Sequence, residues 1–337
     1  MQGQKIRSVL SRHLPFLQHT LFWGIAALCL LTGLRADLAL LLGIFLALGI
    51  GTPYPKQTGK VMKHLLAISI IGLGAGMNLT DIAQAGMSGL GYTFVSIAFV
   101  LICGQILGHL FKTDRVLSLL ISVGTAICGG SAIAAVAPVL KAKDHQISIA
   151  LGVVFVLNAL ALFLFPWIGH IVDMPQELFG LWSALAIHDT SSVVGAGLQY
   201  GPEALEVGTT VKLVRALWII PVVFLVYAFY VRGESGSNDP ESKFEEKSPR
   251  IKYPWFILGF VLMAALATWL PVFAPAAEMI AFSAKRLLVV VLFLIGTSLS
   301  LEALRSSGFA PLLQGVCLWI LVSISSFFMI YSGVMTP

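Results

Sequence analysis

The chain has 337 residues, of which 58% are apolar and 11% are charged. A typical soluble domain carries about a quarter charged residues, and a soluble chain of this size needs a polar surface that so few charges cannot supply. Ten of the charges also crowd the short stretch 232–252. The composition therefore excludes a soluble enzyme and predicts an all-α, polytopic membrane protein.

The net charge of +5 does not indicate a nucleic-acid partner. The basic residues stand at the ends of apolar runs, as orientation signals do in membrane proteins. The four cysteines fall inside apolar runs without a CxxC spacing, which is typical of small core residues. We expect neither a metal site nor a cofactor.

Apolar segments follow one another along the whole chain. A spanning helix needs about 20 largely apolar residues, and the sequence predicts eleven such transmembrane segments, of which the first two are short and could form a tight hairpin. They lie near 21–34, 38–50, 63–79, 88–111, 117–140, 147–172, 179–200, 211–231, 254–272, 285–302 and 309–333.

Lysine and arginine in short loops predict the orientation. Basic residues before the first span favour a cytoplasmic segment at 1–20, and the polar stretch 232–252 fits a charged cytoplasmic linker. The membrane domain then comprises 21–231, with spans one to eight, and 253–337, with spans nine to eleven. The basic pairs after segment five and before segment ten disagree with this orientation. Re-entrant fifth and seventh segments would remove the first conflict, so full spanning of these two segments stays open.

Two internal similarities suggest duplication. At an offset of 222 residues, Lys63-His64-Leu65-Leu66 matches Lys285-Arg286-Leu287-Leu288, which fits an inverted repeat of the kind found in secondary transporters. At an offset of 60 residues, Ala126–Ser131 resembles Ala186–Ser191. These pairings cannot all arise from one duplication, and chance similarity among helices rich in leucine, glycine and alanine is the alternative.

The fifth segment contains Gly129, Gly130 and Ser131 within 124–132. Each glycine costs a helix roughly 1 kcal/mol relative to alanine, and backbone freed inside a membrane must face protein or a watery cavity. The sequence therefore predicts a broken helix whose ends favour anions. The alternative is close helix packing through small residues.

The seventh segment, which we also expect to be broken near 186–197, places five polar residues in a row inside an apolar run: His188, Asp189, Thr190, Ser191 and Ser192. Charged residues at membrane depth are costly and usually mark a pathway, a relay or a paired site. Histidine titrates near neutral pH, and the aspartate can carry or neutralise charge. The alternative is a single His–Asp hydrogen bond that joins two helices.

Three further residues are candidates for substrate binding. Lys212 and Arg215 are spaced i,i+3 at the start of the eighth span and share one helical face. Such a pair can bind an oxyanion, whereas the alternative is snorkelling or an orientation signal. Asn158 is a lone amide in the sixth span, a residue type that usually makes an interhelical hydrogen bond.

Catalytic patterns are missing from the sequence. His188, Asp189 and Ser191 have the residue types of a hydrolase triad, but close neighbours on one helix do not form its geometry, and no GxSxG elbow is present. We therefore expect that the protein is not an enzyme.

The two motifs Gly124–Ala135 and Ala186–Ala196 resemble the YeiH-like family of bacterial inner-membrane proteins, which are named as sulfate exporters. The resemblance covers nearly the whole chain. It implies a multi-pass protein of the bacterial plasma membrane. It also implies a place in the broad group of cation–proton antiporters and bile-acid-symporter-like proteins, which have inverted repeats and crossed, broken helices.

Three functions compete. The first is secondary active transport of a small inorganic or organic anion, of the sulfate or sulfonate class, by alternating access with H⁺ or Na⁺ as coupling ion. The second is a cation exchanger in which Asp189 binds Na⁺ or H⁺ while Lys212 competes as a counter-charge. The third, a membrane-embedded enzyme, is disfavoured. The expected partners are the lipid bilayer and the small anion. The sequence leaves the oligomeric state open.

Overall fold

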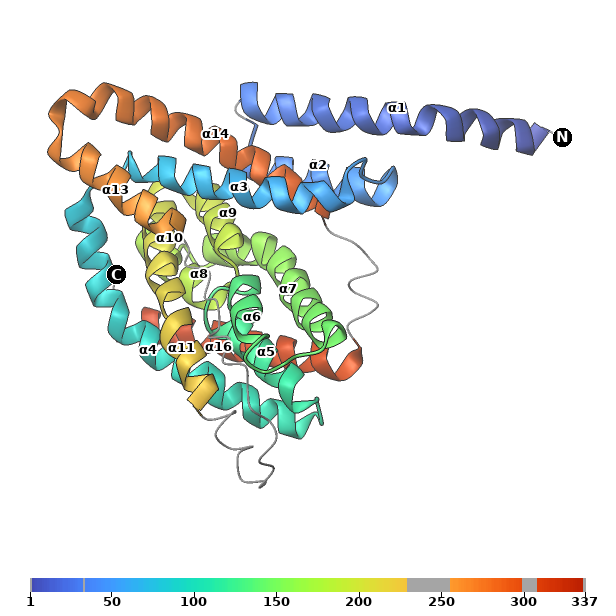
Figure 1. Ribbon diagram of the computed structural model, residues 1–337. Coiled ribbons are helices and arrows are strands. Elements are labelled where there is room, and N and C mark those ends of the chain that lie inside the picture. The colour runs from blue at the N-terminus through green and yellow to red at the C-terminus, as the bar shows by residue number, and fades with distance from the viewer. Residues whose placement is uncertain (1, 33, 229–254, 299–307, 336–337) are drawn as a thin grey trace, which may run out of the picture. The chain divides into compact units, whose positions relative to one another are not determined.

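The computed structural model describes residues 2–32, 34–228, 255–298 and 308–335, and these residues are helical with short connections (Figure 1). They contain no β-strand. The all-α fold predicted from the composition is thus confirmed. The charged linker expected at 232–252 lies outside the described residues.

The chain divides into two compact units, each built from segments that are far apart in sequence. The first unit combines Met1–Asp81 with Trp255–Leu301, and the second combines Ile82–Pro254 with Glu302–Pro337. Packing between distant helices, rather than the order of spans along the chain, produces this grouping.

The first unit contains five α-helices and a short 3₁₀ turn among its described residues. They are α1 (Gln2–Leu31), α2 (Ala36–Gly49), α3 (Pro55–Gly74), α13 (Trp255–Trp269), η2 (Pro271–Phe273) and α14 (Ala274–Ser298). Helix α14 packs along both α2 and α3 (Figure 1). Helix α1 is continuous, so residues 2–20 extend directly into the first apolar segment. Helix α14 begins well before the expected residue 285, which places the basic pair Lys285 and Arg286 inside a helix.

Glycines allow the helices of the first unit to approach closely. A Cβ atom added to Gly43 on α2 would lie 2.2 Å from the carbonyl oxygen of Phe293 on α14. One added to Gly296 would lie 2.4 Å from the carbonyl oxygen of Leu40. Small residues at such contacts permit backbone packing within a membrane. The α2–α14 contact therefore requires glycine on both helices.

We expect Gly43→Ala to destabilise the first unit by about 1–3 kcal/mol, the usual cost of overpacking, because its methyl group meets backbone that cannot rotate away. The matched control is Gly24→Ala on α1, where a Cβ atom has nothing within 4 Å. This control should be neutral or stabilising by up to about 1 kcal/mol. Thermal unfolding in detergent distinguishes the two, and equal melting temperatures would contradict the packing argument.

The second unit holds the remaining helices: α4 (Leu79–Leu110, from Ile82 onward), α5 (Arg115–Ala126), α6 (Gly130–Val136), α7 (Asp144–Ile171), α8 (Gln176–Ala186), α9 (Thr190–Tyr200), α10 (Pro202–Leu217), α11 (Ile219–Val226) and α16 (Phe309–Tyr331). Segments five and seven of the sequence each form two helices here, α5 with α6 and α8 with α9. Helix α8 packs on α10 and α16, and α7 packs on α5 and α9.

Five described helical stretches are long and apolar enough to cross a membrane, judged by length and composition. They are Gly91–Leu110, Asp144–Ile171, Pro202–Val226, Ala274–Thr297 and Phe309–Tyr331. Shorter apolar helices accompany them in both units. Large apolar side chains such as Trp167, Phe282 and Phe328 are exposed, as a lipid-facing surface requires.

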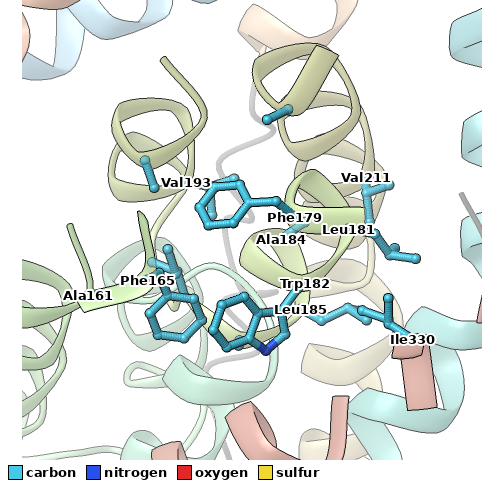
Figure 2. Close-up of a cluster of buried hydrophobic side chains, with 14 of the residues drawn as sticks. Ala161, Phe165, Phe179, Leu181, Trp182, Ala184, Leu185, Val193, Val211 and Ile330 are labelled. Atoms are coloured by element: carbon cyan, nitrogen blue, oxygen red, sulfur yellow. The ribbon is translucent and has the colours of Figure 1, made fainter. Parts of the chain in front are cut away.

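A cluster of buried hydrophobic side chains, with aromatic rings among them, forms the core of the second unit (Figure 2). The rings of Phe165 on α7 and Trp182 on α8 stack with centroids 4.3 Å apart. The indole Nε1 of Trp182 donates a hydrogen bond of 2.9 Å to the carbonyl oxygen of Ser323 on α16. A buried Trp usually finds such a partner. The stacked rings and this hydrogen bond together hold α8 against α7 and α16.

Candidate functional site

The first interruption lies between α5 and α6. Helix α5 ends at Ala126, helix α6 begins at Gly130, and Gly129 between them has φ 66° and ψ −123°. Glycine adopts this left-handed backbone without steric cost, whereas other residues rarely do. The break predicted near the paired glycines is therefore confirmed.

The second interruption lies between α8 and α9. Helix α8 ends at Ala186 and α9 begins at Thr190. The two breaks lie at matching positions of the similarity at offset 60. Ala126 corresponds to Ala186, and Gly130 corresponds to Thr190. The two similar sequence segments thus adopt similar broken-helix geometry.

The two breaks contact each other. A Cβ atom placed on Gly129 would lie 3.4 Å from the Cβ atom of Asp189 and 3.1 Å from a methyl group of Val154 on α7. A side chain at position 129 would therefore crowd Asp189. The glycine keeps the two breaks in direct contact.

Arg215 on α10 joins the ends of α5 and α8. Its side chain is 0% exposed. The Nε atom donates to the carbonyl oxygen of Ala126 at 2.6 Å. The Nη1 atom donates to the carbonyl oxygens of Ala184, at 3.1 Å, and of Leu185. One guanidinium thus holds the carboxyl ends of both half-helices.

Lys212 lies one turn earlier on α10 and is also 0% exposed. Its Nζ atom donates to the carbonyl oxygen of Ile187 at 2.7 Å and to that of Ala184 at 3.3 Å. The last carbonyls of a helix lack intrahelical partners and carry about half a negative charge. Both cations therefore neutralise helix ends, and neither side chain reaches the surface as a snorkelling residue would.

Asp189 caps helix α9. Its Oδ2 atom accepts a hydrogen bond of 3.2 Å from the backbone N–H of Ser191 and another from the Ser191 hydroxyl. Aspartate is a favoured residue at this position because its oxygen satisfies an N–H group of the first turn. The polar run therefore begins a helix, as the sequence Asp-Thr-Ser-Ser could have indicated.

His188 does not bond to its neighbour. Among the described residues, neither ring nitrogen of this fully buried side chain has a hydrogen-bond partner. The backbone at Asp189 is extended, with φ −98° and ψ 145°, so consecutive side chains point in opposite directions. The His–Asp hydrogen bond considered from the sequence is not formed.

Asn158 connects α7 to the second break, as expected of a lone amide in a membrane helix. Its Oδ1 atom accepts a hydrogen bond of 3.2 Å from the backbone N–H of Asp189. Its side chain is 4% exposed, and its Nδ2 atom finds no partner in the part of the chain that the structure describes. The amide therefore retains a donor at the start of α9.

The remaining candidates differ in exposure. Thr190, Ser191 and Ser192 are buried, Gly130 is partly buried, and Ser131 is exposed at the start of α6. The sequence interpretation missed buried threonines on the elements that form the site. Within residues 2–228, the hydroxyls of Thr125, Thr209 and Thr210 are buried without a hydrogen-bond partner. The adjacent Thr209 and Thr210, within one turn of Lys212 in an apolar helix, could have indicated these buried hydroxyls from the sequence.

A metal site does not emerge from the described residues, in which no three His, Cys, Asp or Glu side chains come together. The site is instead a meeting point of two broken helices, two buried cations and one carboxylate. Such an arrangement can hold a small charged solute at membrane depth.

Comparisons with known proteins agree with the family resemblance that the two motifs indicate. A family model described as conserved hypothetical protein 698 matches residues 21–317. A UPF0324 membrane protein of Bdellovibrio bacteriovorus is 55% identical over 298 residues, which cover 88% of this chain and 89% of the relative. The UPF0324 membrane protein of Bacteroides thetaiotaomicron is 48% identical over 87% of this chain and 85% of the relative. That of Geobacter sulfurreducens is 47% identical over 90% of this chain and 93% of the relative. No solved structure matches. The chain belongs to the YeiH-like, UPF0324 family of membrane proteins.

Proposed function

We propose that the protein is a secondary transporter of a small anion, of the sulfate or sulfonate class, in the bacterial inner membrane. Discontinuous helices that meet near the middle of a membrane domain are the usual place where transporters bind their substrates. Both breaks lie in the second unit and contact each other through Gly129 and Asp189. The protein would then act by alternating access and not as an enzyme.

The charge balance of the site is the observation that carries the proposal. With all three side chains ionised, Lys212 and Arg215 would supply two positive charges and Asp189 would supply one negative charge. The partial charges at the carboxyl ends of α5 and α8 oppose those at the amino ends of α6 and α9. In that state one positive charge is left without a counter-charge among the buried described residues, and an anion would compensate it.

The same contacts argue against a cation exchanger. That hypothesis requires Lys212 to compete with a cation for the carboxylate of Asp189. The ammonium group instead donates to the carbonyl oxygens of Ala184 and Ile187. Within the described residues, no ion pair of 4.0 Å or less joins Lys212 to Asp189. The lysine therefore donates to the end of α8 and makes no direct ion pair with the carboxylate.

A flux panel in proteoliposomes tests the proposed function. Purified protein is reconstituted, and the movement of sulfate, sulfite, taurine, Na⁺ and H⁺ is measured separately, with and without pH and Na⁺ gradients. We expect one or more anions to move, with the accelerating gradient identifying the coupling ion. Na⁺/H⁺ exchange without any anion requirement would favour the cation exchanger, and a chemically altered solute would favour an enzyme.

His188→Gln should displace the pH profile of this flux. The buried imidazole precedes Asp189 directly and lies within electrostatic range of Lys212 and Arg215. Its replacement changes the polar surroundings of the carboxylate but preserves that carboxylate. We expect the pH of half-maximal flux to move by at least about 0.5 unit, with the profile retained. The matched control is His145→Gln, an exposed histidine in the first turn of α7, and identical profiles for both variants would contradict this role.

A further inference from the structure

The amino end of α9 is occupied by the protein's own carboxylate. Asp189 accepts two hydrogen bonds from Ser191 there, at a helix end buried by the surrounding side chains. The N–H groups of a first helical turn attract anions of any origin. The Asp189 carboxylate therefore fills a position that a bound anion would also favour.

Asn158 provides an independent indication of a ligand at this place. The bond from Asp189 N–H to Oδ1 holds the amide at the start of α9, so the Nδ2 atom, which is bonded to the same carbon as Oδ1, lies there too. This donor is buried and, over the described residues, has no partner. An unsatisfied buried donor of this kind is costly and suits an acceptor that the protein itself does not provide.

The groups that face Asp189 come from three elements. Lys212 on α10 and Cys128 in the first break lie within its electrostatic range, and His188 is its neighbour in the chain. Helix α7 contributes the neutral amide of Asn158. Asp189 is thus the acidic group of the cluster, and its protonation would leave the two cations of α10 facing no carboxylate there.

We propose that Asp189 is a tethered competitor of the transported anion. It occupies the amino end of α9 when the site is empty, and an entering anion takes its place and accepts a hydrogen bond from Asn158 Nδ2. The displaced carboxylate takes up one solvated proton (H⁺) from the bulk solution and becomes a neutral carboxylic acid, so anion and proton bind together. This inference rests on the proposed transport of anions, and it assigns the coupling proton to Asp189 and a substrate contact to Asn158.

Binding measurements on the full chain in detergent test the competition. Methanesulfonate and sulfate serve as probes because neither changes its charge between about pH 5 and pH 8, so any pH dependence belongs to the protein. For wild type, we expect the dissociation constant to fall by up to about tenfold for each unit of decreasing pH, as the uptake of one proton requires. Protonation of Asp189 removes the competing negative charge, so the dissociation constant of the anion falls as the pH falls.

Asp189→Asn should bind both probes more tightly than wild type at pH 8, by about tenfold or more, and its affinity should not depend on pH. Asparagine still caps the helix, so folding is retained. The matched control is Asp114→Asn, since Asp114 caps α5 in the same manner by accepting from Val116 and Leu117 N–H groups. That control should keep the pH dependence of wild type.

Asn158→Ala should weaken binding of both probes by about tenfold, also in the Asp189→Asn background, where a change in the competing carboxylate cannot explain the loss. Melting temperatures show whether each variant is folded. Equal affinities of wild type and Asp189→Asn, or wild-type binding without pH dependence, would overturn the tethered competitor and leave anion transport standing. Absence of binding in every variant would overturn both.

Discussion

Arg215→Met is expected to lower the free energy of unfolding by about 3–5 kcal/mol, the largest effect among the substitutions considered. The guanidinium donates to the carbonyl oxygens of Ala126, Ala184 and Leu185. A buried acceptor that loses its partner costs about 1–3 kcal/mol, and methionine fills the volume without donating. Titration with SDS in detergent micelles measures the change.

Two comparisons make this expectation specific. Lys212→Met should cost less, because Lys212 bonds only to α8 and its connection among the described elements. Lys63→Met, on the exposed surface of α3, should stay within about 0.5 kcal/mol of wild type. If Arg215→Met were as stable as Lys63→Met, other groups would have to satisfy the helix ends, and the bridging role of Arg215 would be wrong.

Asp189→Asn is expected to abolish proton-coupled flux while the protein stays folded. If the carboxylate displaces the anion on its return to α9, the variant lacks the group that drives release. An affinity raised tenfold comes mostly from slower dissociation, so flux should fall by about tenfold or more. Flux against pH in proteoliposomes measures the effect, and the profile of the variant should be flat.

The control for this experiment is again Asp114→Asn, which replaces a helix-capping carboxylate away from the two breaks. It should transport with the rate and pH profile of wild type. Unchanged flux and an unchanged pH profile in Asp189→Asn would reduce the polar run at 188–192 to a helix cap.

The broken helices could be predicted from sequence because their signals are local. Adjacent Gly129 and Gly130 weaken helix propagation wherever they occur, and Gly129 has the backbone angles that glycine permits. The five polar residues from His188 onward interrupt an apolar run in the same direct way. Both breaks are present in the structure, at matching positions of the offset-60 similarity.

The contacts of the site could not be predicted because they depend on tertiary packing. The i,i+3 spacing places Lys212 and Arg215 on one face of α10, but no pattern shows that this face meets the carboxyl ends of α5 and α8. The donors that the sequence assigned to an anion are largely used on backbone carbonyls. Most of the hydrogen bonds of these two side chains are therefore committed to the protein's own backbone.

The grouping into two units was equally hidden from the sequence. Helix α3 packs against α14, although about two hundred residues separate them in the sequence. The pairing depends on glycine contacts such as that of Gly72 with Ala284. The offset-222 similarity links these same two helices, but similarity between segments does not reveal that they touch. Part of its second copy, at 299–307, lies outside the described residues.

Anion counterflow tests the central claim most directly. Proteoliposomes that contain the protein are loaded with unlabelled sulfate or methanesulfonate, and uptake of the same labelled anion is followed with Na⁺ and pH equal on both sides. A transporter that binds anions at the two breaks should take up label faster when the internal anion is present, and Arg215→Lys should reduce this uptake. Uptake equal to that of protein-free liposomes for every anion, together with Na⁺/H⁺ exchange by the same preparation, would contradict the account.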